Sequence, residues 1–135
     1  MKAYEYKHIV SFEETNLVGN VYFANHVKWQ GRVREMFLKD HAPDIIDLFK
    51  KDLALVTTKV SCEYFIELFA LDEILIKMYV TQITQNRVTM KFEYFRKDQL
   101  CASGEQQIAC MMKSESGIVP EQIPDSLKNA LLIYF

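Results

Sequence analysis

The stretch FEETNLVGNVYFANHVKWQGRVREMFL, residues Phe12–Leu38, joins a strand to the one long helix that the sequence predicts. Polar residues leave the strand, a turn containing Gly19 follows, and a helical pattern runs from about Ala24 to about Lys39. The first turn of a helix has free backbone N–H groups and the positive end of the helix dipole. A site for an oxyanion could therefore form where this turn meets the helix.

Two residues of this predicted helix are unusual. Gly31 lies in mid-helix, where glycine costs about 1 kcal/mol relative to alanine. Arg34 lies on a mostly apolar stripe of the helix, whose other members are Val27, Gly31 and Leu38. An arginine in such a place either lies at the rim of the core with its charged end in water, or points into a pocket. The spacing leaves both possibilities open.

Strands and short helices surround the long helix. A strand is expected at Tyr4–Phe12, and His41-Ala42-Pro43 ends the long helix because a residue before proline avoids the α region. A short helix is expected at Asp44–Lys51, followed by strands in which apolar and polar residues alternate. These strands are Leu53–Ile66, Glu73–Gln85, Arg87–Arg96 and Leu100–Lys113, and a last helix is expected at Asp125–Leu132.

Short links between the later strands imply antiparallel neighbours. Each strand has one apolar face, which in Leu53–Ile66 includes Val56 and Val60, so the sheet needs a cover on one side. The sequence therefore predicts an α+β fold, a single domain over residues 1–135 in which a five-stranded antiparallel sheet wraps around one long helix. The apolar end Leu131–Phe135 is expected to pack on its own sheet or on a second subunit.

The composition of the 135 residues is that of a globular domain, with 50% hydrophobic residues and a net charge of −2. No basic run points to nucleic acid, and no apolar run approaches the ~18 residues that span a bilayer. The N-terminus lacks the apolar centre of a signal peptide. Three cysteines without a CxxC motif indicate reduced thiols. We therefore expect a cytoplasmic protein that binds neither nucleic acid nor membrane.

Few residue patterns indicate a reaction. The sequence has no HExxH, no Cys/His pairs at ligand spacing, no GxSxG elbow and no phosphate loop, so we expect neither a metal nor a cofactor. His26 is the histidine best placed for chemistry, because it lies in the first turn of the long helix beside Asn25. His8 is expected to be structural. The adjacent carboxylates Glu13 and Glu14 are expected to be solvated.

The pattern Asn16-x-x-Gly19-x-Val21-Tyr22-x-x-Asn25-His26, continued by Gly31-x-x-Arg34, resembles the hotdog-fold thioesterases of the 4-hydroxybenzoyl-CoA thioesterase type. The chain departs from that pattern at Asn16, Gly31 and His26, where the family has an aspartate, a helix glutamate and a tyrosine. The runs Thr15–Phe23 and Trp29–Leu38 are similar to the branch that works with enediyne polyketide synthases, as are Val56-Thr57-Thr58 and Cys62-Glu63-Tyr64.

This resemblance implies a hydrolase that cleaves a polyene β-keto thioester from the acyl carrier protein domain of an iterative type I polyketide synthase, in antibiotic biosynthesis. The freed β-keto acid can then lose CO₂. No catalytic carboxylate acts in this branch: Asn16 and Arg34 take the main roles, with Thr57 and His26 nearby. The resemblance also implies a homo-oligomer, a dimer or a dimer of dimers (a homotetramer), with sites between subunits.

A hypothesis for the site follows from the resemblance. Arg34 holds an enolate or carboxylate oxygen, Asn16 orients the thioester or the water, and His26 either donates a hydrogen bond or acts as a base. Backbone N–H groups near Ala24 and Asn25 form the oxyanion hole. The acyl channel is expected to be lined by Tyr22, Val27, Gly31 and Leu38. The alternatives are a general acyl-CoA thioesterase and a non-catalytic acyl-binding module, which turnover of CoA and carrier-protein thioesters would discriminate.

Overall fold

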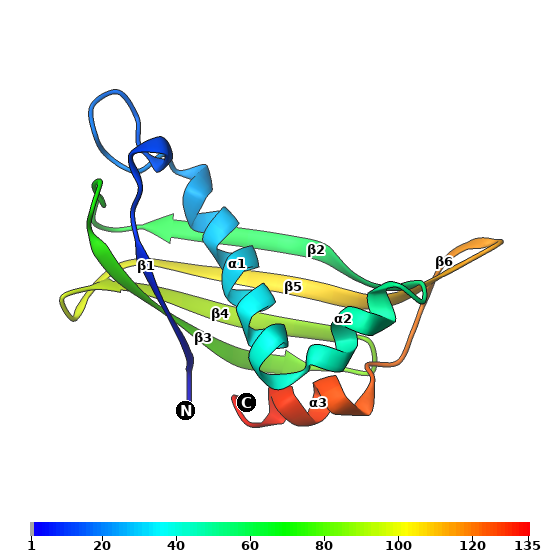
Figure 1. Cartoon of the computed structure of the whole chain (residues 1–135). Coiled ribbons are helices and arrows are strands. Elements are labelled where there is room, and N and C mark those ends of the chain that lie inside the picture. The colour runs from blue at the N-terminus through cyan, green and yellow to red at the C-terminus, as the bar shows by residue number, and fades with distance from the viewer. Residues whose placement is uncertain (1) are drawn as a thin grey trace.

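The computed structural model describes residues 2–135. The long helix α1 (Ala24–His41) lies across one curled antiparallel sheet (Figure 1). The strands are β1 (Tyr4–Ile9), β2 (Leu53–Tyr64), β3 (Glu73–Ile83), β4 (Arg87–Arg96), β5 (Gln99–Ser114) and β6 (Gly117–Pro120). The other helices are the 3₁₀ turn η1 (Phe12–Glu14), α2 (Pro43–Phe49) and α3 (Asp125–Leu132).

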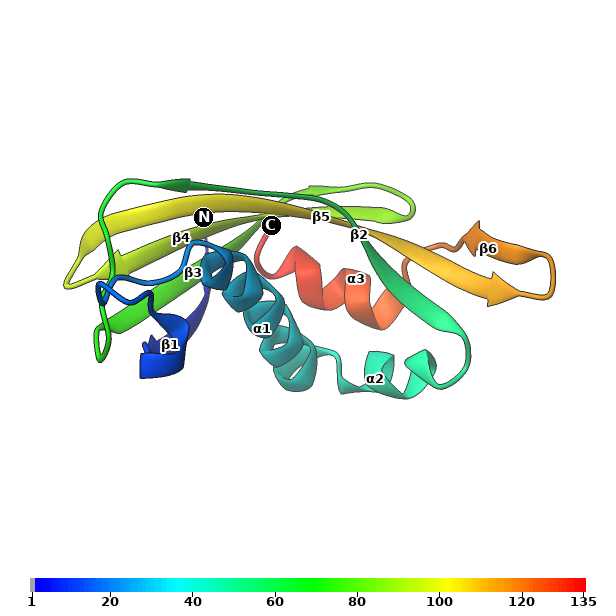
Figure 2. The ribbon, with the colours of Figure 1, turned by 90° about the horizontal axis from the view of Figure 1, so that it is seen from above.

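The strand order is β1-β3-β4-β5-β2, and every neighbouring pair is antiparallel. The predicted α+β architecture, an antiparallel sheet wrapped around one long helix, is confirmed. The sheet has a sixth strand, because β5 continues beyond its last pair with β4, Arg87 with Ala109, and pairs through residues 111–114 with β6 (Figure 2). All four residues of β6 are exposed, so this strand has no apolar alternation from which the sequence could predict it.

The core lies between α1 and the concave face of the sheet. Trp29, Val33 and Phe37 of α1 are at most 2% exposed. The alternation predicted for β3 and β4 is confirmed, since the inward residues of both strands are buried. At the C-terminus, Leu131 and Tyr134 are buried whereas Leu132, Ile133 and Phe135 are exposed, so only part of the tail packs on its own domain. No helix within residues 2–135 combines the length and the hydrophobicity that crossing a membrane requires.

Strand β2 differs from the central strands because it forms an edge of the sheet, with only β5 beside it. All residues of the segment 56–61 are exposed, and the pairing register shifts between Thr57 and Lys59. The prediction that Val56 and Val60 belong to a buried face is therefore wrong: they are 38% and 42% exposed. An edge strand presents N–H and C=O groups that another strand can pair with.

Candidate active site

The loop that carries Asn16 is a tight turn before α1. The amide of Asn16 donates to the carbonyl of Asn20 over 2.7 Å, and Gly19 has φ +95°, a conformation that favours glycine. The exposed side chain of Asn16 donates from Nδ2 to Oδ1 of Asn20 over 3.1 Å. Leu17 and Val18 project into solvent at the tip. Figure 1 shows this loop extending beyond the N-terminal end of α1.

His26, in the first turn of α1, is 4% exposed. Its ring packs among Trp29, Tyr64 and Tyr94, with ring centroids 5.0, 4.7 and 5.4 Å away. Burial lowers the pKa of His26 from its ordinary value to about 4, so the imidazole is neutral at pH 7. Within residues 2–135 its Nδ1 has no hydrogen-bond partner. The ring is therefore a neutral polar group in an aromatic setting.

The His26 ring also lines a pocket of about 300 Å³ beside the start of α1. The other walls come from the loop and from the end of β2: Asn20, Val21, Phe23, Tyr64, Phe65, Ile66, Glu67 and Leu68. A mostly apolar lining with a few polar groups is typical of sites for small organic ligands. We take this hollow, the His26 pocket, as one half of the candidate site.

The backbone donors at the helix start are partly engaged. The amide of Asn25 donates to the carbonyl of Tyr22 over 2.9 Å, and its side-chain Nδ2 donates to the carbonyl of Glu14 over 2.8 Å. Ala24, the first residue of α1, has no backbone acceptor for its amide among the described residues. Of the two predicted oxyanion donors, Ala24 is thus the one that is free in this structure.

Arg34 lies in the middle of α1, and its guanidinium points to the sheet. Nη1 donates to Oε1 of Gln106 over 2.8 Å and to Oγ1 of Thr57 over 3.4 Å. Burial lowers the pKa of Arg34. In the described chain no carboxylate lies within 4 Å of this guanidinium. A cation held by neutral partners in a partly buried place favours an anionic ligand.

Three side chains on α1, at intervals of four residues, face β2. As the helix advances along the chain, the residues of β2 that it contacts have decreasing numbers. The contacts are His26 with the ring of Tyr64 at 4.7 Å, Gln30 Nε2 with the carbonyl oxygen of Ser61 at 3.1 Å, and Arg34 with Thr57. We call His26, Gln30 and Arg34 the helix row. Because a helix rises 1.5 Å per residue, about 12 Å separates the two ends of this row along the axis.

Gly104 of β5 makes the middle contact of the helix row possible. A Cβ atom at this position would clash with Nε2 of Gln30 and would lie 2.7 Å from the carbonyl oxygen of Ser61. Gln30 is fully buried, and its Oε1 has no partner among the described residues. The glycine thus sets how closely α1 approaches the edge of the sheet.

The predicted channel residues lie in different surroundings. Val27 and Gly31 are half-buried, and a Cβ atom added to Gly31 would meet nothing within 4 Å. Gly31 therefore faces open space. Leu38 belongs to the hydrophobic core, and Tyr22 lies at the loop exit with 47% of its surface exposed. The single chain leaves room for a channel at Gly31 and does not place all four residues along it.

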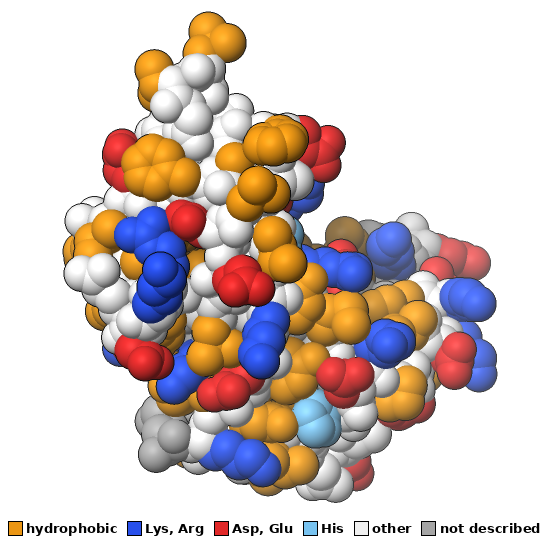
Figure 3. Space-filling model, turned by 60° about the vertical axis from the view of Figure 1, so that its left-hand side comes forward, with side chains coloured by type: hydrophobic (Ala, Val, Ile, Leu, Met, Phe, Trp, Pro, Cys, Tyr) orange, Lys and Arg blue, Asp and Glu red, His pale blue; other side chains and the backbone are white. Residues whose placement is uncertain are grey.

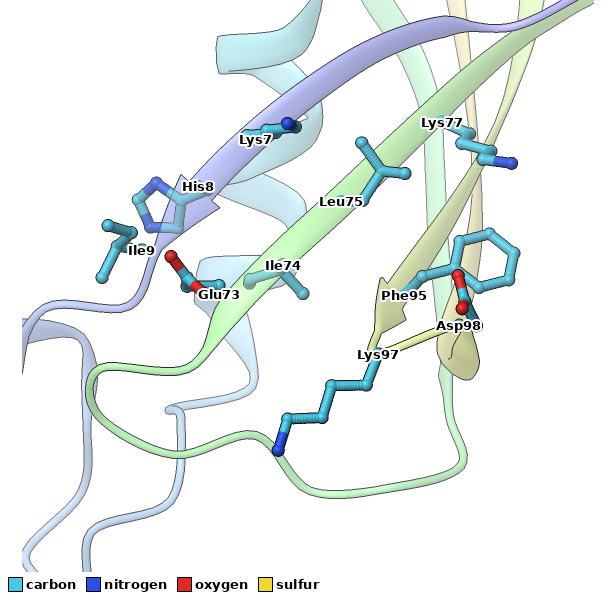
Figure 4. Close-up of a pocket in the computed structure, with 10 residues that line it drawn as sticks. All are labelled: Lys7, His8, Ile9, Glu73, Ile74, Leu75, Lys77, Phe95, Lys97 and Asp98. Atoms are coloured by element: carbon cyan, nitrogen blue, oxygen red, sulfur yellow. The ribbon is translucent and has the colours of Figure 1, made fainter.

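A separate hollow of about 680 Å³ lies over β1, β3 and β4 (Figure 4). Lys7, Leu75, Lys77 and Phe95 border it, and Nζ of Lys77 lies 5.2 Å from the centre of the Phe95 ring. No residue predicted for the site lines this hollow, so we place the site at the His26 pocket and at Arg34. In residues 2–135 no group of three His, Cys, Asp or Glu side chains could hold a metal ion.

Two residues at or beside the site were not predicted for it. Gln106 is 4% exposed at an inward position of β5, so a polar residue in phase with Gly104 and Ile108 was the available signal. Glu14 was expected to be solvated like Glu13, and this is wrong because Glu14 is 5% exposed. The signal for Glu14 was its place three residues after Ser11, a spacing typical of a capping box.

Comparisons with known proteins show which family this chain belongs to. Residues 10–131 match the family model described as the thioesterase-like superfamily. A 1,4-dihydroxy-2-naphthoyl-CoA hydrolase of Microcystis aeruginosa is 25% identical over 127 residues, which cover 93% of this chain and 91% of that protein.

Solved structures include two similar proteins of known activity. The dynemicin thioesterase, whose crystal structures revealed induced-fit and allosteric effects upon polyene binding, is 40% identical with a TM-score of 0.96, covering 98% of this chain and 97% of that one. A 1,4-dihydroxy-2-naphthoyl-CoA thioesterase from Synechocystis is 20% identical with a TM-score of 0.89, covering 97% and 96%, and its likeness concerns the fold alone. The resemblance predicted from Thr15–Phe23 and Trp29–Leu38 is confirmed.

Proposed function

This chain belongs to the thioesterase-like superfamily and is a hydrolase, and from this premise we propose that it releases a polyene β-keto acyl chain from the acyl carrier protein domain of an iterative type I polyketide synthase. The observation that carries the proposal is Arg34, a partly buried cation whose contacts, Thr57 and Gln106, are neutral. A β-keto thioester develops negative charge on oxygen during hydrolysis, and such a cation stabilises that charge.

The proposed reaction is attack of water on the thioester carbonyl. The oxygen of water bonds to the carbonyl carbon, the carbon–sulfur bond breaks, and the sulfur of the carrier's thiol leaves with a proton. The β-keto group makes the carbonyl more electrophilic, so fixed donors can accelerate attack without a catalytic carboxylate. Arg34 holds the enolate or carboxylate oxygen, and Asn16 orients the thioester or the water. The free β-keto acid can afterwards lose CO₂.

His26 acts in this proposal as a hydrogen-bonding group and not as a base. Its pKa of about 4 makes it a weak base at neutral pH, whereas its neutral ring borders the pocket beside the free amide of Ala24. The amide of Ala24 is the proposed oxyanion donor. Val27 and Gly31 would guide the acyl chain along the open side of α1.

The single chain leaves Asn16 and Arg34 apart. Arg34 is ten residues into α1, about 15 Å along the axis from Ala24, whereas Asn16 lies on the loop before the helix. We propose that a second copy completes the site by antiparallel pairing of its β2 with this β2. In such a pair the C-terminal end of one β2, at Tyr64, lies beside the N-terminal half of the other β2, which contains Thr57. The loop of one subunit therefore approaches Arg34 of its partner.

Exposed apolar side chains support an oligomer. Figure 3 shows hydrophobic side chains spread over the end of the molecule that carries the loop. Exposed residues in this part of the chain include Phe12, Leu17, Val18, Tyr22, Phe23 and Phe65. A second exposed group lies on α2 and the C-terminal tail: Ile46, Phe49, Leu132, Ile133 and Phe135. Two such patches favour a dimer of dimers, in which each patch forms one contact.

The first experiment measures release of product from a partner synthase loaded with substrate, for wild type, Arg34→Ala and Asn16→Ala. We expect the wild type to release the polyene acid and both variants to lose about 10²- to 10³-fold in rate, as removal of an oxyanion donor typically does. Equal release by all three proteins would contradict the roles of both residues. Stoichiometric binding without any turnover would favour a non-catalytic acyl-binding module.

A second experiment tests the shared site. Subunits carrying Asn16→Ala are co-expressed with subunits carrying Arg34→Ala, and the mixed oligomer is isolated by two different tags. If each site takes Asn16 from one subunit and Arg34 from the other, the mixed dimer has one intact site and regains activity that neither parent has. A mixed dimer as inactive as its parents would place both residues in the same chain's site.

General acyl-CoA hydrolysis is the second candidate, because a relative at 25% identity is a CoA hydrolase. The same acyl chain is therefore offered on a carrier protein and on CoA. We expect a higher kcat/KM for the carrier-protein thioester, and a preference for CoA would make this chain an acyl-CoA thioesterase.

A further inference from the structure

Glu14 is the only acidic side chain that is buried among the described residues, at 5% exposure. It ends η1, immediately before the loop that carries Asn16. A carboxylate out of water is costly unless several donors compensate it, so a buried glutamate at this place needs an explanation.

Three donors compensate the Glu14 carboxylate. Oε1 accepts from the Ser11 amide over 2.9 Å and is hydrogen-bonded to Nε2 of His8 at 2.8 Å, while Oε2 accepts from Nε1 of Trp29 over 2.6 Å. Burial works to raise the pKa of Glu14, but the hydrogen bonds from Ser11, Trp29 and His8 outweigh it and the pKa is lowered. The side chain is therefore an anion that ties β1 to α1.

The backbone of Glu14 ties the loop to the helix at the same point. Its carbonyl accepts from the amide of Tyr22 over 2.9 Å and from Nδ2 of Asn25 over 2.8 Å. One residue thus joins the strand before the loop, the end of the loop and the first turns of α1. Trp29, which the carboxylate holds, packs against the ring of His26 with centroids 5.0 Å apart.

We propose that Glu14 is a positioning residue, whose side chain and carbonyl hold the Asn16 loop and the start of α1 in the geometry that hydrolysis requires. This role rests on the proposed function. Glu14 itself does not touch the substrate. It acts by fixing the free amide of Ala24, the His26 ring and the Asn16 turn relative to one another.

The test compares Glu14→Gln with Glu13→Gln, a matched control in which the neighbouring exposed carboxylate is changed. An amide in place of the carboxylate has a single acceptor oxygen, so its NH₂ group must face one of the three donors. We expect kcat of Glu14→Gln to fall about 10- to 100-fold, as misplacement of catalytic groups does, with KM little changed and Glu13→Gln like wild type.

Two further measurements separate positioning from simple stabilisation. Trp29→Phe removes the indole N–H, so adding it to Glu14→Gln relieves a contact between two donors, and kcat of the double variant should recover above that of Glu14→Gln alone. Amide hydrogen exchange of residues 15–24 should be faster in Glu14→Gln than in Glu13→Gln. Exchange of the amides in β3 and β4 should have the same rate in both variants.

A folded Glu14→Gln protein with wild-type kcat and wild-type loop exchange would overturn the proposal. If Glu14→Gln does not fold, Trp29→Phe is the deciding variant, because it removes one donor to Glu14 and keeps the charge of the carboxylate. A reduced kcat of Trp29→Phe would support the positioning role of Glu14, and a wild-type kcat would overturn it. Absence of hydrolysis by the wild type would overturn the proposed function, whereas normal wild-type hydrolysis with an unaffected Glu14→Gln would overturn only the role of Glu14.

Discussion

Glu14 and Arg34 are both charged residues in contact with α1 and the sheet, but their surroundings differ. Three donors, Ser11, His8 and Trp29, surround the Glu14 carboxylate. The Arg34 guanidinium has two neutral acceptors, Thr57 and Gln106, and no carboxylate within 4 Å in the described chain.

The two surroundings suit different roles for the two charges. A fully compensated buried charge fixes the geometry around it, because every part of it is already bonded. A charge with neutral partners gains most when an anion arrives, since only then is its own field neutralised. The first arrangement suits the support of a site, and the second suits the site itself.

The largest expected effect is a difference in stability between Glu14→Leu and Arg34→Met. Glu14→Leu leaves one buried donor, Trp29, and two half-buried donors, Ser11 and His8, without their acceptor, and should lower the free energy of unfolding by about 3 kcal/mol. Arg34→Met removes an uncompensated cation and should change stability by less than about 1 kcal/mol or raise it, while turnover is lost. Urea unfolding of both variants measures this, and equal destabilisation would remove the distinction between the two charges.

His26 extends the comparison to a buried group that is neutral. Its pKa is about 4 in the folded chain and higher in the unfolded chain, so between these values only the unfolded chain binds the proton. Stability should therefore fall as pH decreases from about 6.5 to about 4, by up to about 3 kcal/mol. His26→Phe should remove this part of the pH dependence. The rate should also show no step from His26 between about pH 5.5 and 8, and a clear step there would restore the role of a base.

Gly104→Ala should disrupt the hydrogen bond between Gln30 of α1 and the carbonyl oxygen of Ser61, the middle contact of the helix row. The new Cβ atom would press on Gln30 and on the carbonyl oxygen of Ser61, and we expect a loss of about 1–3 kcal/mol in unfolding free energy. Adding Gln30→Ala removes only the contact with the side chain, so the double variant should stay less stable than Gln30→Ala alone. Equal stabilities would show that β2 shifts without cost.

Gly31→Ala should have the smallest effect and the opposite sign. The added Cβ atom meets nothing within 4 Å, so the helix gains about 1 kcal/mol in stability from the better helix former. A larger side chain, in Gly31→Leu, should fill the open space near Arg34 and shorten the acyl chain that is accepted. Product lengths measured by mass spectrometry decide this, and unchanged chain selectivity would exclude Gly31 from the channel.

Much of the fold was predictable because local patterns carried it. The alternation in β3 and β4 and the helix from Ala24 depend on neighbouring residues in the chain, and both are confirmed. The stripe predicted on that helix is not its buried face, because only Leu38 of the four residues is buried. The error in β2 arose because Val56 and Val60 have the pattern of a buried strand, although their neighbours in space lie on one side only. A pattern with period 2 does not distinguish a face covered by the same chain from one that awaits a partner.

The runs Thr15–Phe23 and Trp29–Leu38 were sufficient to identify the family, and the helical pattern marked Arg34 as an unusual residue of the helix. The folded chain was needed to see that Glu14 is buried, that Gln106 reaches Arg34, and that Asn16 and Arg34 lie apart in one chain. The physical reason is that charge compensation and burial depend on groups far away in the sequence: Glu14 meets Trp29 across 15 positions, and Arg34 meets Gln106 across 72.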